Sequence, residues 1–189
     1  MRKEMNSIRL IAPVAALVLL FGCGGSSSDS KAKALGYTAP AGTSWRLLQD
    51  ESSTDKRLVL NLVGPSGTLA RGVGLTVQAP SAKVGFGTFS GSYIQDTGVF
   101  DLVNTTTKGE PTLISGGVSG DKLMLGLFQK GIVKDAKDCG APLLQFVVVI
   151  KDGAPTGPVP LTVTKAQILP ADLSANQDIT VAVGTVSLK

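Results

Sequence analysis

The residues with the most reactive chemistry in this sequence are two cysteines, Cys23 and Cys139. The 189 residues contain no histidine. Without histidine there is no imidazole general base, no Ser-His-Asp or Cys-His catalytic arrangement, and no histidine ligand for zinc or haem. The remaining chemistry of a thiol is acylation, oxidation or disulfide formation, and the surroundings of each cysteine indicate which of these applies.

Cys23 closes the first strongly apolar run of the chain. Basic residues precede the run at Arg2, Lys3 and Arg9, and residues 10–21 are apolar throughout. Twelve residues are too few for a membrane-spanning helix, which needs about 18–20 apolar residues, but they suit the central region of a secretory signal. Gly24, Gly25 and three serines follow the cysteine and predict a flexible tether.

The stretch Leu20-Phe21-Gly22-Cys23 resembles the lipobox of bacterial lipoproteins. In that family the signal is removed before the cysteine, whose thiol receives a diacylglyceryl group. One acyl chain holds a protein to a membrane only marginally, so stable anchoring requires more than one. The resemblance implies a signal peptide over 1–22, lipidation of Cys23 and a tether over 23–35. Because Gly24 is not aspartate, it also implies the outer membrane of the cell envelope. The alternative is an ordinary secretory signal.

Cysteine pairing and net charge both depend on this assignment. If Cys23 is lipidated, Cys139 has no disulfide partner, and its polar segment predicts either a loop cysteine packed at the domain edge or a reactive thiol. Five of the eighteen basic residues lie within residues 1–34, which leaves thirteen basic and twelve acidic residues beyond them. This balance gives no support to nucleic-acid binding.

Two aromatic residues and two aspartates are the remaining candidates for a binding or catalytic site. Trp45 and Tyr93 could stack on a sugar ring, although the strand context of Trp45 favours core packing and Tyr93 falls in an expected loop. Asp96 and Asp101 could form the carboxylate pair of a hydrolase, or they could be solvated turn residues. No catalytic residue is assigned, and the chain is not expected to be an enzyme.

Calcium is the one cofactor that the composition leaves open, because it binds carboxylate and carbonyl oxygens. Asp135 and Asp138 are the acidic residues closest to a calcium-loop spacing. Lys134 and Lys137 interleave with them, which argues against an acidic cage. No cofactor or metal site is therefore assigned.

The elements that must position these residues are β-strands. Apolar and polar residues alternate between Gly/Pro-rich turns, and no segment of ten residues has a helical period. The expected strands are 44–49, 57–63, 72–78, 84–89, 99–103, 112–118, 122–129, 143–151, 159–168 and 179–188. The run 143–151 is nearly continuously apolar, as in a strand buried on both faces. Residues 37–43 are an entry segment. About eight to ten short strands in residues 36–189 predict a single antiparallel β-sandwich of the jelly-roll type.

Several of these stretches resemble cohesin domains, jelly-roll modules that are themselves similar to carbohydrate-binding modules. The likeness covers residues 57–189 and rests on the order and pattern of five segments: Arg71–Pro80, Lys83–Phe86, Ser119–Phe128, Leu143–Val163 and Ile179–Leu188. In cohesins one flat sheet face binds a calcium-loaded dockerin. The resemblance implies a cohesin-like sandwich, without carrying over any individual binding residue.

The sequence therefore predicts a lipid-anchored envelope protein that acts as a non-catalytic adhesion or assembly module. Its expected partners are the membrane, through the anchor, and an envelope or extracellular protein. Two alternatives stay open. A carbohydrate-binding lipoprotein would need Trp45 or Tyr93 exposed in a groove and would bind polysaccharide. An envelope hydrolase would need Asp96 and Asp101 to face each other across a cleft.

Overall fold

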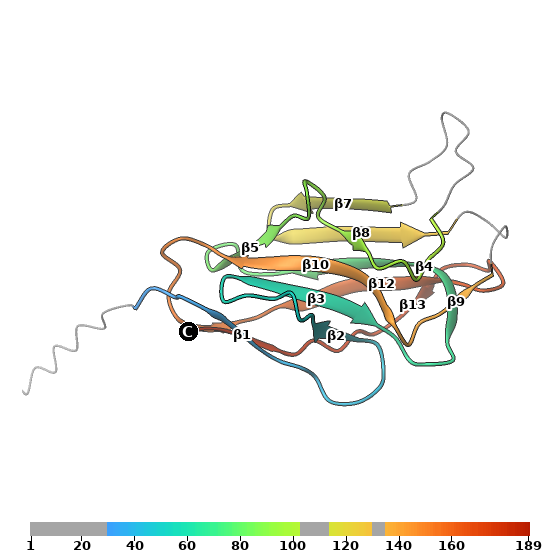
Figure 1. Cartoon of the computed structure of the whole chain (residues 1–189), viewed down its shortest axis with the longest axis horizontal. Coiled ribbons are helices and arrows are strands. Elements are labelled where there is room, and N and C mark those ends of the chain that lie inside the picture. The colour runs from blue at the N-terminus through green and yellow to red at the C-terminus, as the bar shows by residue number, and fades with distance from the viewer. Residues whose placement is uncertain (1–29, 103–113, 130–134) are drawn as a thin grey trace, which may run out of the picture.

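The computed structural model describes residues 30–102, 114–129 and 135–189. Within these ranges the chain is all-β, and every pairing between named strands is antiparallel. Figure 1 shows two layers, with β3 and β10 nearer the viewer than β4 and β12. None of the described residues forms a helix that is long and apolar enough to cross a membrane. The predicted antiparallel β-sandwich is confirmed.

Two sheets form the body of the sandwich and a third, smaller one closes an end. The five-stranded sheet contains β2 (Arg46–Gln49), β3 (Arg57–Val63), β10 (Pro142–Ile150), β5 (Val84–Gly87) and β6 (Gln95–Asp96). The six-stranded sheet contains β13 (Gln177–Asp178), β12 (Thr162–Pro170), β4 (Leu69–Gln78), β8 (Lys122–Phe128), β7 (Ile114–Ser119) and β9 (Lys137–Asp138). The three-stranded sheet contains β1 (Leu35–Thr38), β14 (Thr185–Leu188) and β11 (Gly157–Val159).

The core lies between the two larger sheets and follows from the period of two in their strands. Side chains alternate between the two faces of a strand, so every second residue of each strand points inward. The inward residues are aliphatic or aromatic and buried: Leu58, Leu60 and Leu62 of β3, Val73, Leu75 and Val77 of β4, Leu123, Leu125 and Leu127 of β8, and Leu144, Phe146 and Val148 of β10. The expectation that 143–151 is buried on both faces is confirmed for most of β10.

Most expected strands are present, and the differences have local causes. The expected strand 159–168 is divided between β11 and β12 at Pro160, which has no N–H for a ladder hydrogen bond. Of 179–188, only Thr185–Leu188 is a strand. The expected strand 99–103 is wrong for residues 99–102, which form no strand and follow Gly98 at a φ of +80°. Residue 103 of this expected strand, and residues 112 and 113 of the expected strand 112–118, lie outside the described residues. Fourteen strands are described, three of them only two residues long.

The N-terminal boundary of the fold lies earlier in the chain than the sequence suggested. The expected entry segment contains β1, which pairs with β14. The Ala32 N–H donates to the Ala154 carbonyl at 2.8 Å, and the Lys33 N–H donates to the Lys189 carbonyl at 2.7 Å. The last residues of the predicted tether are therefore hydrogen-bonded into the domain beside its C-terminus. Residues 23–29 of the tether lie outside the described residues.

Tyr37 in β1 joins three separate segments through its hydroxyl. This hydroxyl donates to the Leu47 carbonyl at 2.8 Å and accepts from the Gly184 N–H at 3.0 Å. Burial raises the pKa of Tyr37, and the Gly184 hydrogen bond partly opposes the increase. A Cβ at Gly184 would overlap the Thr38 carbonyl oxygen, so this close approach requires glycine.

Candidate functional site

The predicted lipidation site cannot be placed in the fold, because Cys23 and the predicted signal peptide 1–22 lie outside the described residues. What the structure adds is the distance available to an anchor. The chain is hydrogen-bonded into the domain from Ser30, whose carbonyl accepts from the Thr156 N–H at 3.2 Å. Six residues lie between Cys23 and Ser30, so even when fully extended this stretch spans at most about 25 Å. The anchoring of Cys23 stays a prediction.

Trp45 and Cys139 pack together inside the domain. Trp45 is 7% exposed and Cys139 is fully buried. A Cβ at Gly64 would lie 2.8 Å from Cys139 Cβ and 2.9 Å from the Trp45 ring, so the three residues are in close contact. Burial raises the pKa of the Cys139 thiol to about 12, and the adjacent Asp138 carboxylate contributes to the increase. Trp45 is therefore unavailable as a sugar platform, and Cys139 is a protonated, enclosed thiol rather than a reactive one.

Tyr93 is half-buried and borders a hollow of about 230 Å³ between β5 and the β7–β8 hairpin. Phe86 and Val118 give the hollow an apolar wall, while Asp121 and Lys151 contribute its charged groups. Tyr93 and Phe86, both only partly buried, are thus the two aromatic residues that border this hollow. With Trp45 in the core, Tyr93 is the one predicted residue on which the sugar-binding alternative still depends.

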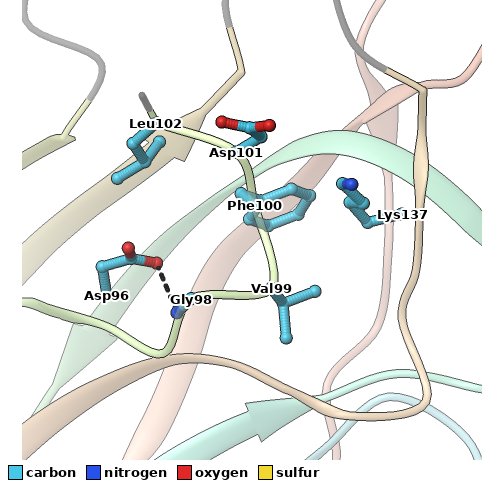
Figure 2. A pocket seen from close by; sticks show the side chains of 7 residues that line it. All are labelled: Asp96, Gly98, Val99, Phe100, Asp101, Leu102 and Lys137. Carbon is cyan, nitrogen blue, oxygen red and sulfur yellow. Dashed lines mark hydrogen bonds between the residues drawn. The ribbon is translucent and has the colours of Figure 1, made fainter. Parts of the chain in front are cut away.

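Asp96 and Asp101 border one pocket of about 540 Å³ together with Phe100 and Lys137. Figure 2 shows the two carboxylates apart from each other, with that of Asp96 directed toward Gly98 of its own loop. Its Oδ1 accepts a hydrogen bond of 3.0 Å from the Gly98 N–H. Asp96 thus stabilises the turn that precedes Phe100, which is a structural use of the carboxylate and not that of a catalytic acid.

Asp138 also uses its carboxylate to order a loop. Its Oδ2 accepts from the Gly67 N–H at 2.6 Å, and its Oδ1 accepts from the Gly140 N–H at 2.7 Å. These bonds join the turn before β4 to the loop that follows β9. Across the described residues, no group of three or more Asp, Glu, Cys or His side chains is placed to hold a metal ion.

The outer face of the five-stranded sheet has almost no exposed surface along its centre. We call the outward residues Val59, Asn61 and Val63 of β3 and Gln145 and Val147 of β10 the closed face. By alternation these residues point away from the core, yet Val59 is 1%, Asn61 is 5% and Val147 is 0% exposed. Asn61 and Gln145 are direct cross-strand neighbours. A flat row of small side chains, joined by polar contacts, leaves little of this face for a partner.

A carboxylate holds the polar centre of the closed face together. Asp50 Oδ2 accepts from Asn61 Nδ2 at 2.9 Å and from Gln145 Nε2 at 2.8 Å. Its Oδ1 accepts from the Ser52 hydroxyl at 2.6 Å and from the Ser52 N–H. These hydrogen bonds, those of Ser52 first, lower the pKa of Asp50. Sequence analysis did not identify this network, because its members lie 11 and 95 positions from Asp50.

The outer face of the six-stranded sheet has a different construction, because several outward positions are glycine. We call the outward residues of β12, β4 and β8 the open face: Lys165, Gln167, Gly72, Gly74, Thr76, Met124, Gly126 and Phe128. A Cβ at Gly72 would overlap the Phe128 ring, whereas a Cβ at Gly74 would find only van der Waals contacts at 3.8 Å. The Phe128 ring therefore lies over the backbone of Gly72 and close to Gly126, whereas the backbone of Gly74 is less closely covered.

Met124 stands at the other end of the open face. It is 50% exposed, among the most exposed large apolar side chains in the described residues. It borders a shallow hollow of about 300 Å³ whose floor includes Gly74 and Thr76 and whose far side is formed by Lys165 and Gln167. Strands β4, β7, β8 and β12 contain no Asp or Glu. In the neighbouring strand β13, Asp178 lies opposite Gln167 and accepts a hydrogen bond from its Nε2 at 2.8 Å. The open face thus combines exposed Met124, a glycine backbone and the lysines of β8 and β12 with one carboxylate at its β13 edge.

The sequence contained a signal for this face that was not used. Glycine stands at outward positions 72 and 74 of one strand and 126 of its neighbour, and their register brings Gly74 directly opposite Gly126. Glycine in a strand interior weakens the strand and often marks a site where another backbone or ligand approaches closely. Without the pairing register, the three glycines could not be recognised as one surface.

Comparison with known proteins identifies the fold and nothing finer. No protein-family model and no curated protein matches the sequence. The sixth cohesin of scaffoldin B from Acetivibrio cellulolyticus, solved in complex with a dockerin mutant, is similar with a TM-score of 0.51 at 11% identity, over 77% of this chain and 96% of that one. A type I cohesin–dockerin complex from Clostridium thermocellum gives 0.50 at 7% identity, over 75% and 94%. The chain therefore has a cohesin-like β-sandwich fold.

Proposed function

We propose that this protein is a non-catalytic module that binds another protein through its open face. The observation on which the proposal depends is Met124, a large apolar side chain that is 50% exposed beside a glycine floor. Flexible, polarisable methionine is common at binding surfaces that adapt to a partner. The flat glycine backbone lets a partner approach closely, while the core residues behind it keep the sheet rigid.

The structural comparisons support the same class of function. Both solved structures described above are, by their descriptions, cohesins in complex with dockerins. At 7–11% identity this likeness concerns the fold, so it supports a protein partner without identifying one. A calcium-loaded dockerin is one member of the class of partner that the proposal includes.

The chemistry of the open face defines what its partner should present. Lys165 and Lys122 are the charged residues near Met124 on β12 and β8. The four longest strands of this sheet, β4, β7, β8 and β12, contain no carboxylate, whereas Asp178 lies opposite Gln167 on β13. A complementary surface would place an apolar side chain over the Met124 hollow and acidic groups opposite the lysines. Such charges increase the association rate and the specificity more than they increase the affinity.

A site-resolved cross-link tests this proposal before the partner is known. A photoreactive amino acid is introduced in place of Met124, and in a matched chain in place of Leu69, which is equally exposed at the far end of β4. Irradiation of the cells that produce the protein should give one discrete adduct from position 124 and none from position 69. No adduct from 124, or the same adducts from both positions, would contradict binding at the open face.

The second part of the proposal is that Cys23 anchors this module to a membrane of the cell envelope, with the outer membrane favoured. The support is the lipobox-like sequence together with the entry of the chain into the fold at Ser30, shortly before Lys33 donates to the Lys189 carbonyl. The short span from Cys23 would hold that end of the sandwich within about 25 Å of the membrane.

Metabolic labelling tests the anchor independently of the partner. Cells that grow with an alkyne fatty acid should incorporate the label into the wild-type chain and should not incorporate it into the Cys23→Ala variant. An unlabelled wild-type chain, secreted and free of membrane, would indicate the ordinary secretory signal instead. Cys139→Ala is the matched control and should retain the label, because the Cys139 thiol is enclosed.

A further inference from the structure

The six-stranded sheet has two long edges, and within residues 30–102, 114–129 and 135–189 only one of them is protected. Three features interrupt the β12 edge: the charged Lys165, a register shift between Val163 and Lys165, and the short strand β13. Such devices discourage another chain from extending a sheet. Strand β7, at the opposite edge and outermost along the upper side of Figure 1, has six uncharged residues, no proline and an unbroken register with β8. Among the described residues, β7 pairs on one side only.

An inward-facing residue of β7 is also left uncovered. Val118 pairs with Leu123, which is fully buried, so both side chains point toward the inside of the sandwich. Val118 is nevertheless 41% exposed, because it borders the hollow between β7 and β5. A further strand beside β7 would place its own inward side chain against Val118 and remove this surface from water.

The sequence of β7 indicates which strand that would be. A second sheet can continue the first only if inward residues oppose inward residues, since directly opposite residues of an antiparallel pair point to the same face. With Gly116 opposite the partner's Gly116, Ile114 lies opposite the partner's Val118 and Ser115 opposite the partner's Gly117. The five residues Ile-Ser-Gly-Gly-Val are therefore self-complementary in this register, with apolar residues paired at both ends and no charge to repel.

We propose that β7 is a self-association edge, at which two copies of this chain pair antiparallel about a two-fold axis that passes between their two Gly116 residues. An isologous contact requires one surface to complement itself, which this strand does. The axis is perpendicular to the sheet, so the open faces of both copies point in the same direction. On the proposed function, the dimer would present two Met124 surfaces side by side to a partner with two binding elements, which increases avidity.

Sedimentation equilibrium of the full-length chain in detergent tests the association. The wild-type chain should show a mass that rises from one copy to two as its concentration increases. Val118→Lys places a charge opposite the partner's Ile114 and should weaken the dimer at least tenfold, while Leu69→Lys, the same change at another exposed apolar residue, should leave it intact. A wild-type chain that stays monomeric at every concentration, or a dimer lost with Met124→Lys and not with Val118→Lys, would overturn the proposal.

Disulfide cross-linking tests the register. A mixture of the Ser115→Cys and Gly117→Cys chains should form an intermolecular disulfide, because these positions are opposite each other when the two Gly116 residues are paired. Either chain alone should not form it, since identical positions would then be more than about 7 Å apart. The wild-type chain, which also contains Cys23, shows whether that thiol forms an intermolecular disulfide by itself. Cys139 is buried, so its thiol should not take part in the cross-link. A disulfide from Gly117→Cys alone would overturn this register.

Photocross-linking from position 124 is unaffected by these changes and tests the proposed function separately.

Discussion

The two outer faces of the sandwich differ in what their central strands present to solvent. The closed face has valines and a hydrogen-bonded Asp50–Asn61–Gln145 row, and its central residues are almost fully buried. The open face has glycine at the equivalent outward positions and a half-exposed Met124 at one end. Both sheets contribute aliphatic residues to the same core, so the core does not explain the difference. The comparison teaches that one face leaves little surface for a partner, whereas the other has the exposed apolar side chain and glycine backbone on which the proposed binding function rests.

The largest effect should come from a charge on the closed face. Val147→Asp would bury an unpaired carboxylate at a position with no exposed surface, and it should reduce the free energy of unfolding by about 4 kcal/mol or prevent folding. Thr76→Asp, its counterpart on the open face, lies opposite Lys165 and should change stability by less than about 1 kcal/mol. Urea denaturation of both variants measures the difference. Equal losses would mean that the two faces are equally closed.

Removal of the Asp50 carboxylate should have the next largest effect. Asp50→Ala leaves the buried amide of Asn61 without its acceptor and should reduce the free energy of unfolding by about 1–3 kcal/mol. The Oδ1 atom of Asn61 is already buried without a partner among the described residues, so little compensation is available. Thermal denaturation near neutral pH measures the loss. A variant as stable as the wild type would show that the polar row does not maintain the closed face.

The same network predicts a pH dependence with a definite sign. The pKa of Asp50 is lower in the folded than in the unfolded chain. Its contribution to stability is therefore complete above the unfolded value, near 3.9, and is lost as the pH falls through the folded pKa. The difference in stability between the wild type and Asp50→Asn should shrink over that acidic range. A difference that is constant from neutral to acidic pH would contradict the assigned role of the charge.

A smaller effect separates two glycines of the open face. Gly72→Ala would force the Phe128 ring aside and should reduce the free energy of unfolding by about 1–3 kcal/mol, whereas Gly74→Ala adds a methyl group with ordinary contacts and should change it by less than about 0.5 kcal/mol. Denaturation of the two single variants tests the arrangement. A destabilising Gly74→Ala would mean that the glycine floor is already covered.

The sequence was sufficient to predict the fold because the β-sandwich depends on a local pattern. Alternation predicted β3 at Arg57–Val63 with its bounds, and the apolar run 143–151 predicted a strand buried on both faces. Pro160 interrupted an expected strand, and the residues after Gly98 were too irregular for pattern reasoning. β1 was missed because its four residues show no clear alternation before they pair with β14.

The candidate site was less predictable, because it depends on register. Trp45 is a strand residue in sequence, and only the three-dimensional structure shows that Gly64 and Cys139 enclose it. In the sequence, Met124 is one apolar residue in an apolar strand. Its exposure follows from its outward position between Thr76 of β4 and Gly117 of β7, which only the pairing register shows. The hydrogen-bonded row of Asp50, Asn61 and Gln145 likewise depends on the pairing of β3 with β10, which brings Asn61 opposite Gln145. Contacts between distant strands, rather than residue types, therefore define both outer faces.

The most direct test of the open face as a binding surface is the affinity of Met124→Lys for the partner identified by cross-linking. The variant should be as stable as the wild type within about 0.5 kcal/mol, because the side chain is half exposed. Its dissociation constant should rise at least tenfold, the loss of about 1.4 kcal/mol expected for a central apolar contact. Leu69→Lys should bind as the wild type does. An unchanged affinity of Met124→Lys would contradict the proposed function.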